Sequence, residues 1–323
     1  MPLVTIISPC YNVESYVARF LESLLSQTYG CLEVVLVNDG STDGTAGIIS
    51  KYLPLLEQKG YRVVNVEQAN AGLAGAINSG LKHITGKYLM WPDPDDWLVP
   101  NAVEKFVSFM ESHPQVDIVR GRVKKIEAES GKSMGCFGGF FPQSGEIRHF
   151  FRRALYVQTW LAPVGYMLRV ASLDRAIPGR EIYVHPRAGQ NWQLMLPLAY
   201  RGKVFQIRDF VGYYYVRKDS HSRILGGYGA HLFCNEVYEQ VLLRTLSRIP
   251  GTEEWQKKVR IEYAKKRILL SKQYVEKAGL VAGIRHYLAE SRGVMAGIHA
   301  RLWLLLPWRL VMLYRRLRRR IPG

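Results

Sequence analysis

Residues 32–45, Leu-Glu-Val-Val-Leu-Val-Asn-Asp-Gly-Ser-Thr-Asp-Gly-Thr, join an apolar run to a polar turn. The first half of this stretch is rich in β-branched and aliphatic side chains and predicts a buried strand. Gly40 permits a tight turn, and Ser41 or Thr42 can cap a helix that follows. The stretch therefore predicts one strand–turn–helix unit, with Asp39 pointing into the crevice beyond the end of the strand.

The same alternation extends along the chain on both sides of this unit. Strand-like runs at 3–8, 32–38, 62–67 and 88–91 alternate with runs of helical period at 16–25, 46–56, 73–83 and 102–110. Such alternation is typical of βαβ units whose mainly parallel sheet is covered by helices on both faces. We therefore predict an α/β fold with a Rossmann-like sheet.

The pattern changes after about residue 117. A strand is expected at 118–125, a Gly-rich loop at 131–139, an aromatic strand at 211–216, and helices at 232–246 and 255–275. We expect three parts: an α/β domain over residues 1–225, a helical segment over 226–300, and a basic tail over 301–323.

Three carboxylates, Asp93, Asp95 and Asp96, directly follow the apolar run at 88–91. Three like charges so close to a buried strand are costly unless something compensates them, and a hard divalent cation with oxygen ligands is a common solution. The alternative is a solvated turn that caps the next helix. In a parallel sheet, the loops after the strands meet at one edge, so this loop and Asp39 should share a crevice. A carboxylate there suits a uracil N–H or a ribose hydroxyl, which favours a nucleotide diphosphate site.

The charge of the chain is unevenly distributed. The 323 residues carry 44 Lys and Arg against 27 Asp and Glu, a net charge of +17. Residues 251–323 contribute 17 basic and 5 acidic side chains, so most of the excess belongs to the C-terminal part. The four cysteines are far apart and form no C-x-x-C pair, which fits a reducing compartment. With no basic leader before the first apolar run, we expect a cytoplasmic location.

Several separated motifs together resemble those of the inverting family 2 glycosyltransferases, which have the GT-A fold. They are the opening strand and loop at 7–14, the helix end at 26–29, the V-x-D-G-S-x-D-x-T loop at 37–45, the N-x-G-x-x-x-A-x-N-x-G segment at 70–80, the D-x-D-D loop at 93–96, and residues 202–204 and 213–222. The resemblance covers about residues 3–225. It implies metal-dependent transfer of a hexose or N-acetylhexosamine from a nucleotide sugar, expected to be UDP-linked, to a lipid-linked or growing glycan of a cell-surface polysaccharide.

The resemblance also implies roles for particular residues. The residues expected to bind the nucleotide are Pro9, Tyr11, Asp39, Asn70, Asp93, Arg217 and Ser222. Asp95 would be the direct ligand of Mn²⁺ or Mg²⁺, with Asp93 and His221 as further candidate ligands. A bridging cation and a basic side chain would neutralise the charge that develops on the leaving diphosphate.

Two positions depart from the family pattern. Ile77 stands where the family usually has an arginine before the asparagine of A-x-N-x-G. More importantly, the family places its catalytic base in a Gly-Glu-Asp-Trp sequence, whereas residues 189–192 here are Gly-Gln-Asn-Trp. Asn191 cannot deprotonate a sugar hydroxyl at neutral pH.

Three interpretations of this departure stay open. Asn191 and Gln190 can orient the acceptor while another group acts as the base; the sequence candidates are Glu181, His185, Asp96 and His221. The reaction can also proceed with weak or substrate-assisted base catalysis. Finally, the chain can be a non-catalytic homologue that binds sugar nucleotides. A nucleotidyltransferase is a weaker alternative, because residues 8–13 lack a Gly-rich triphosphate loop with a nearby cation.

The C-terminal residues 301–320 interleave an apolar block, which includes Trp303 and Trp308, with seven arginines and no acidic residue. The block is too short to cross a bilayer, which needs about 20 residues in a helix. Basic and tryptophan side chains favour an anionic membrane surface, so we expect peripheral anchoring on the inner face of the cell membrane. The alternative is packing on the protein itself or in a homodimer. No reader motif accompanies the arginines, so no nucleic-acid partner is expected.

Overall fold

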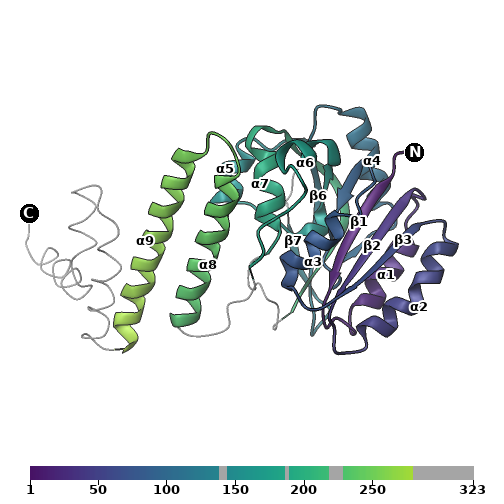
Figure 1. The fold of residues 1–323 in the computed structure, drawn as a ribbon, viewed down its shortest axis with the longest axis horizontal. Coiled ribbons are helices and arrows are strands. Elements are labelled where there is room, and N and C mark those ends of the chain that lie inside the picture. Colours follow the sequence, from purple (N-terminus) through teal and green to yellow (C-terminus); the bar gives the residue numbers. More distant parts are fainter. Residues whose placement is uncertain (138–143, 186–188, 218–227, 279–323) are drawn as a thin grey trace, which may run out of the picture. The chain divides into compact units, whose positions relative to one another are not determined.

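The computed structural model describes residues 1–137, 144–185, 189–217 and 228–278 of the chain (Figure 1). The chain divides into two compact units. The first comprises Met1–Ser220 with Arg244–Ile249, and the second His221–Leu243 with Pro250–Gly323. The boundaries expected at residues 225 and 300 stay predictions, and the tail at 301–323 lies outside the described residues.

A large sheet with the strand order β3-β2-β1-β4-β9-β6-β10-β5 forms the centre of the first unit (Figure 1). The strands are β1 (Val4–Cys10), β2 (Leu32–Asp39), β3 (Arg62–Gln68), β4 (Tyr88–Met90), β5 (Trp97–Leu98), β6 (Ile118–Glu127), β9 (Tyr166–Arg169) and β10 (Val204–Val216). Strands β3, β2, β1 and β4 pair in parallel, whereas β9 is antiparallel to both β4 and β6. The predicted α/β fold is confirmed, with a sheet that is parallel through its first four strands and mixed beyond them.

Helices cover both faces of this sheet. The helices α1 (Val17–Leu25), α2 (Thr45–Gln58) and α4 (Ala102–Ser112) bury side chains in one apolar core with Val4 and Ile6 of β1. The helix α3 (Gly72–Leu81) packs on the other face, where Gly80 lies against Ile7. Alternate residues of a strand point to opposite faces, so β1 contributes to both layers. Each fully buried aliphatic side chain contributes about 1.5–3 kcal/mol, and the buried residues of β1 and β2 therefore anchor the loops that follow them.

The region after β6 differs in part from the expectation. Residues 131–139 were expected to form a Gly-rich loop, but β7 (Ser133–Phe137) pairs antiparallel with β6. The aromatic ring of Phe137 stacks on Trp160 with centroids 5.4 Å apart, a contact that local sequence does not reveal. The short elements β8 (Gly145–Glu146), α5 (Phe150–Leu155), η1 (Pro163–Gly165), α6 (Val170–Ala176) and α7 (Asn191–Arg201) complete the unit.

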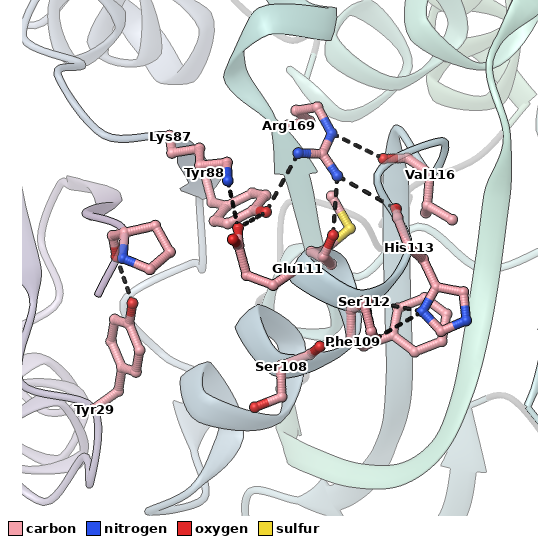
Figure 2. Close-up of polar contacts among 12 residues, drawn as sticks. Tyr29, Lys87, Tyr88, Ser108, Phe109, Glu111, Ser112, His113, Val116 and Arg169 are labelled. Carbon is pink, nitrogen blue, oxygen red and sulfur yellow. Dashed lines mark hydrogen bonds and ion pairs between the residues drawn. The ribbon is translucent and has the colours of Figure 1, made fainter.

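Arg169 at the end of β9 ties the C-terminus of α4 to the sheet (Figure 2). Its Nη2 donates to the main-chain oxygens of Met110 and His113 at 3.1 and 3.4 Å, and its Nε donates to Val116 O at 3.1 Å. Its Nη1 donates to Tyr88 Oη at 3.3 Å. The carbonyl groups at a helix C-terminus have no partners within the helix, so one guanidinium satisfies several of them.

The second unit is helical where the structure describes it. It contains α9 (Glu253–Ala278) and most of α8 (Tyr228–Ser247), as the helical patterns at 232–246 and 255–275 predict. An ion pair between Arg267 and Glu239 joins the two helices. None of the helices in the described part of the chain is long and apolar enough to span a membrane.

Candidate functional site

The carboxyl ends of β1, β2 and β4 lie side by side, because these strands are parallel neighbours in the sheet. Hydrogen bonds fasten the loops after β1 and β2 to each other. Asn12 N–H donates to Ser41 Oγ at 3.1 Å, and Thr42 N–H donates to Asn12 Oδ1 at 2.9 Å. Ser8 Oγ–H donates to Pro92 O at 3.0 Å and so joins β1 to the loop after β4. The polar loops therefore converge, as the strand pattern predicts.

Asp39 lies at this edge of the sheet, at the end of β2. Its side chain is buried, and its Oδ1 accepts hydrogen bonds from Gln68 Nε2 at 2.7 Å and from Ala71 N–H at 2.8 Å. The next residue, Gly40, has φ +71°, and a Cβ there would lie 2.8 Å from the main-chain nitrogen of Asn70. Only glycine fits this close approach between the loops after β2 and β3.

The three carboxylates after β4 gather at the same edge. One oxygen from each of Asp93, Asp95 and Asp96 can be chosen so that all lie within 4.8 Å of one another. A tight turn brings them together: Asp96 N–H donates to Asp93 O at 3.1 Å, with Pro94 in the second position of the turn. Proline fixes φ near −65°, which suits that position.

Two of these carboxyl groups are strongly perturbed. Burial and the Asp95 carboxylate raise the pKa of Asp93 to about 7, against opposing effects of Gln190 and Arg217. Burial and both neighbouring carboxylates raise the pKa of Asp96 well above its usual value, although the Tyr215 N–H and Arg19 oppose this shift.

Asp96 also has an unsatisfied oxygen. Its Oδ1 accepts a hydrogen bond from Tyr215 N–H at 2.9 Å, whereas its Oδ2 is buried and has no hydrogen-bond partner among the described residues. Crowded oxygen ligands with a buried, unsatisfied acceptor fit a hard divalent cation, which would supply the missing positive charge.

Arg217 lies beside the cluster, directly after β10. Its Nε is 3.0 Å from Asp95 Oδ2, and both side chains are largely buried. The expected diphosphate-binding arginine therefore contacts the expected metal ligand.

Of the two amides at the positions where the family has its acidic pair, Gln190 reaches the cluster and Asn191 contacts Trp91, just before the acidic loop. Gln190 Nε2 lies 3.5 Å from Asp93 Oδ1, although 97 residues separate the two in the chain. Trp91 Nε1–H donates to Asn191 Oδ1 at 3.0 Å, so the carbonyl oxygen of this amide is already engaged. The position expected to hold a base thus contacts Trp91, two residues before Asp93, and carries a carboxamide whose oxygen is hydrogen-bonded.

Comparisons with known proteins agree with this geometry. Residues 5–161 match the model of "Glycosyl transferase family 2". The chain contains a family 2 glycosyltransferase domain. It is 37% identical over 128 residues to the glycosyltransferase GlyA of Streptococcus pneumoniae, and 34% identical over 150 residues to the uncharacterized glycosyltransferase EpsJ of Bacillus subtilis. These matches cover 40% and 46% of the chain, but only 18% and 37% of the length of the two relatives.

Solved structures extend the likeness of fold beyond the family 2 domain. TarS residues 1–349 of S. aureus, in complex with UDP-GlcNAc, has a TM-score of 0.58 at 18% identity, over 91% of this chain and 90% of that chain. The mannosyltransferase PcManGT of Pyrobaculum calidifontis, in complex with GDP-Man and Mn²⁺, has a TM-score of 0.54 at 18% identity, over 96% and 85% of the two chains. These likenesses confirm the expected fold.

The other residues that the sequence predicts for the site differ in their exposure. Pro9 is buried in β1, while Tyr11 is 44% exposed and Asn70 is exposed. Glu181 is exposed and His185 is half-buried, and neither belongs to the group of carboxylates close enough to share a cation in the described part of the chain. His221 and Ser222 lie outside the described residues, so their roles stay predictions.

Sequence reasoning missed an aromatic and cationic layer behind the acidic loop. Arg19 of α1 donates through Nη2 to the main-chain oxygen of Asp95 at 3.1 Å and lies against the rings of Trp97 and Tyr215. The available signal was weak: Tyr16 and Arg19 are three residues apart, which places them on one face of α1.

Proposed function

We propose that the protein is a metal-dependent inverting glycosyltransferase that uses a nucleotide-sugar donor, most simply a UDP-sugar. The grouping of the Asp93, Asp95 and Asp96 carboxylates, at the same carboxyl edge of the sheet as Asp39, carries this proposal. The UDP-GlcNAc and Mn²⁺ in the two solved structures of similar fold support the choice of donor class and cation.

Different residues of the site would bind the cation, the nucleoside and the diphosphate of the donor. Asp95, with Asp93 or Asp96, would hold Mn²⁺ or Mg²⁺, whose charge would stabilise the leaving diphosphate. Asp39 and the adjacent Gln68 and Ala71 amides would fix the nucleoside end. Arg217 would offer its guanidinium to the diphosphate, since its ion pair already places it at the acidic loop.

Activation of the acceptor is the part that departs from the family pattern. We propose that Asn191 and Gln190 orient the acceptor hydroxyl and that a different group, or weak base catalysis, removes its proton. The hydrogen bond from Trp91 fixes the Asn191 amide and leaves its NH₂ as the group able to bind an acceptor oxygen. Because residue 191 is an amide, a non-catalytic homologue that binds sugar nucleotides is the second candidate.

The proposed setting follows from the charge of the chain. We propose that the acceptor is lipid-linked or a growing glycan of a cell-surface polysaccharide, and that the enzyme acts in the cytoplasm at the inner face of the cell membrane. The basic residues after position 251 would attract an anionic membrane surface.

Calorimetry with UDP and Mn²⁺, followed by assays of donor hydrolysis and transfer, tests the proposal. Wild type should bind UDP in the presence of Mn²⁺ and consume a UDP-sugar, and Asp95→Asn should lose the metal-dependent part of both. Asp174→Asn is a matched control, because Asp174 forms an ion pair with Arg180 outside the acidic cluster. A folded wild type that binds no nucleotide would rule out the proposal, and binding without turnover of any donor would favour the non-catalytic candidate.

A further inference from the structure

Arg19 lies against two aromatic rings behind the acidic loop. Its guanidinium carbon lies 3.9 Å from the centroid of the Trp97 ring and 4.2 Å from that of Tyr215. The rings come from β5 and β10, which are antiparallel neighbours, and Arg19 comes from α1. The two rings meet at 64° with their centroids 5.9 Å apart, so the guanidinium lies at the corner that they form. A guanidinium can contact aromatic rings in this way and still donate a hydrogen bond from its edge.

The edge of this guanidinium contacts the turn that carries the carboxylates. Arg19 Nη2 donates to Asp95 O at 3.1 Å. The turn itself is closed by the bond from Asp96 N–H to Asp93 O, which leaves the carbonyl of its third residue, Asp95, pointing outward. The orientation of the Asp95–Asp96 peptide decides where both side chains point, and Arg19 binds the oxygen of that peptide.

Further aromatic and cationic contacts connect Tyr215 to the side chain of Asp95. Tyr215 meets Tyr16 edge to face at 5.8 Å, and the Arg217 guanidinium lies 4.7 Å from the Tyr16 ring centroid. Arg217 Nε in turn lies 3.0 Å from Asp95 Oδ2. Asp95 is therefore held at its main chain by one arginine and at its carboxylate by another, and Tyr16 and Tyr215 lie between the two cations.

Packing alone does not account for an arginine at position 19. No ion pair of Arg19 occurs among the described residues, and its Nε is buried without a hydrogen-bond partner there. A half-buried cation with an unsatisfied N–H costs stability relative to an apolar side chain of similar length. The charge of Arg19 serves its contacts with the two rings and its hydrogen bond to Asp95 O, and only the hydrogen bond reaches the acidic turn.

We propose that Arg19 is a positioning residue that holds the Asp93–Asp96 turn in the conformation required to bind a divalent cation. This inference rests on the proposed function, because it assumes that the acidic cluster binds a metal. Pre-arranging ligands lowers the cost of ordering them when the cation binds, so loss of Arg19 should weaken metal binding more than it weakens nucleotide binding.

The test is the dissociation constant of Mn²⁺, measured by calorimetry without donor, together with kcat at saturating Mn²⁺ and UDP-sugar. For Arg19→Met, which keeps the length but not the charge, we expect Mn²⁺ binding at least about tenfold weaker and a kcat that recovers toward wild type at high Mn²⁺. Arg19→Lys keeps the charge but loses the planar guanidinium. Its Mn²⁺ affinity should lie between those of wild type and Arg19→Met. Lys105→Met is the control: Lys105 is also a cation that donates to a main-chain oxygen, that of Phe210 at 3.1 Å, but away from the acidic turn. It should leave Mn²⁺ affinity unchanged.

The outcomes separate this inference from the proposed function. A folded Arg19→Met protein with wild-type Mn²⁺ affinity overturns the inference while leaving the proposed function intact. If Arg19→Met does not fold, Arg19→Lys decides in the same way: weaker Mn²⁺ binding at an unchanged thermal midpoint supports the inference, and unchanged binding overturns it. If wild type itself binds no Mn²⁺, the metal-dependent function fails and the inference fails with it.

Discussion

Asn191 is the residue on which the proposed activation of the acceptor most depends. Its Oδ1 accepts a hydrogen bond from Trp91 Nε1 at 3.0 Å, and an aspartate at this position could accept the same bond. A positioned general base contributes about 10²–10⁴-fold to a rate. We therefore expect Asn191→Asp to raise kcat for transfer by about tenfold or more, measured as UDP release at saturating donor and acceptor.

Asn101→Asp is the matched control for this prediction. It makes the same chemical change at an exposed residue ahead of α4, and kcat should not change. If Asn191→Asp also leaves kcat unchanged while remaining folded, residue 191 does not limit proton removal, and another group or the substrate already performs that step.

Gly40 is a residue at the edge of the site where the fold depends on the absence of a side chain. Its φ is +71° and a Cβ at this position would lie 2.8 Å from the Asn70 nitrogen, so alanine adds both backbone strain and a clash. Gly60 has φ +88° but no atom within 4 Å of such a Cβ, so Gly60→Ala adds the strain alone. We expect Gly60→Ala to lower the free energy of unfolding by about 1 kcal/mol and Gly40→Ala by about 2–3 kcal/mol, measured by urea denaturation. Equal losses would show that the loops can separate to admit a side chain.

The site could be predicted from the sequence where one short motif fixes both chemistry and position. Asp39 and the triplet from Asp93 to Asp96 each directly follow a strand, so the rule for parallel sheets brings them together. Arg19 could not be found in this way, because its role depends on rings contributed by β5 and β10. Nor does the sequence reveal that Trp91 fixes the Asn191 oxygen.

Among the elements, α4 depends on a side chain from β9 for its C-terminus. Arg169 donates to the main-chain oxygens of Met110, His113 and Val116, and Arg169→Met would leave these acceptors without that donor (Figure 2). We expect this change to lower the free energy of unfolding by about 2–3 kcal/mol in urea denaturation. The control Arg175→Met removes an exposed ion pair with Asp117 and should cost less than about 1 kcal/mol. Similar losses in the two variants would contradict the capping role of Arg169.

Glu111, near the C-terminus of α4, should make the stability of the fold depend on pH. Hydrogen bonds from Lys87 and Tyr88 lower the pKa of Glu111 (Figure 2). A lowered folded-state pKa contributes stability above the unfolded-state value of about 4.5, and this contribution is lost as the pH falls through the folded-state pKa. We expect Glu111→Gln to be less stable than wild type at pH 7, by under about 1 kcal/mol because the group is exposed, and the difference to shrink as the pH falls through the folded-state pKa of Glu111. Urea denaturation over a series of falling pH values measures this, and a difference that does not shrink would show that packing rather than charge is responsible.

Periodicity predicted the elements that bury a regular apolar face. The parallel strands β1 to β4 and the helices α1 to α4 lie close to their expected ranges, because each repeats a local pattern against one core. The strand β7 was missed because Ser133–Phe137 is short and is interrupted by Gly135, and it becomes a strand through pairing with β6. The helix α7 begins at Asn191, and its place beside the acidic loop depends on contacts far apart in the chain.

At the scale of the whole molecule, the acidic residues of the proposed donor site and most of the excess basic residues belong to different parts of the chain. The acidic cluster lies in the first unit, whereas residues 251–323 carry a net charge of +12, from 17 basic and 5 acidic side chains. If the acceptor is lipid-linked, as we propose, the enzyme works beside a membrane, and the basic C-terminal part would attract it to an anionic surface. This division predicts that membrane binding and donor binding can be changed independently.

The tail at 301–323 provides the test of that independence. Replacing Arg315, Arg316 and Arg318 with glutamine removes three cations from it, and each basic residue near an anionic surface contributes about 1 kcal/mol. We expect binding to vesicles of phosphatidylglycerol and phosphatidylcholine to weaken about 100-fold in a flotation assay, with UDP and Mn²⁺ affinities unchanged. The matched control replaces three exposed lysines of the first unit, Lys51, Lys59 and Lys82, with glutamine. Because this control removes the same charge from the catalytic unit, equal weakening in both variants would mean that net charge, and not the tail, attracts the protein to the membrane.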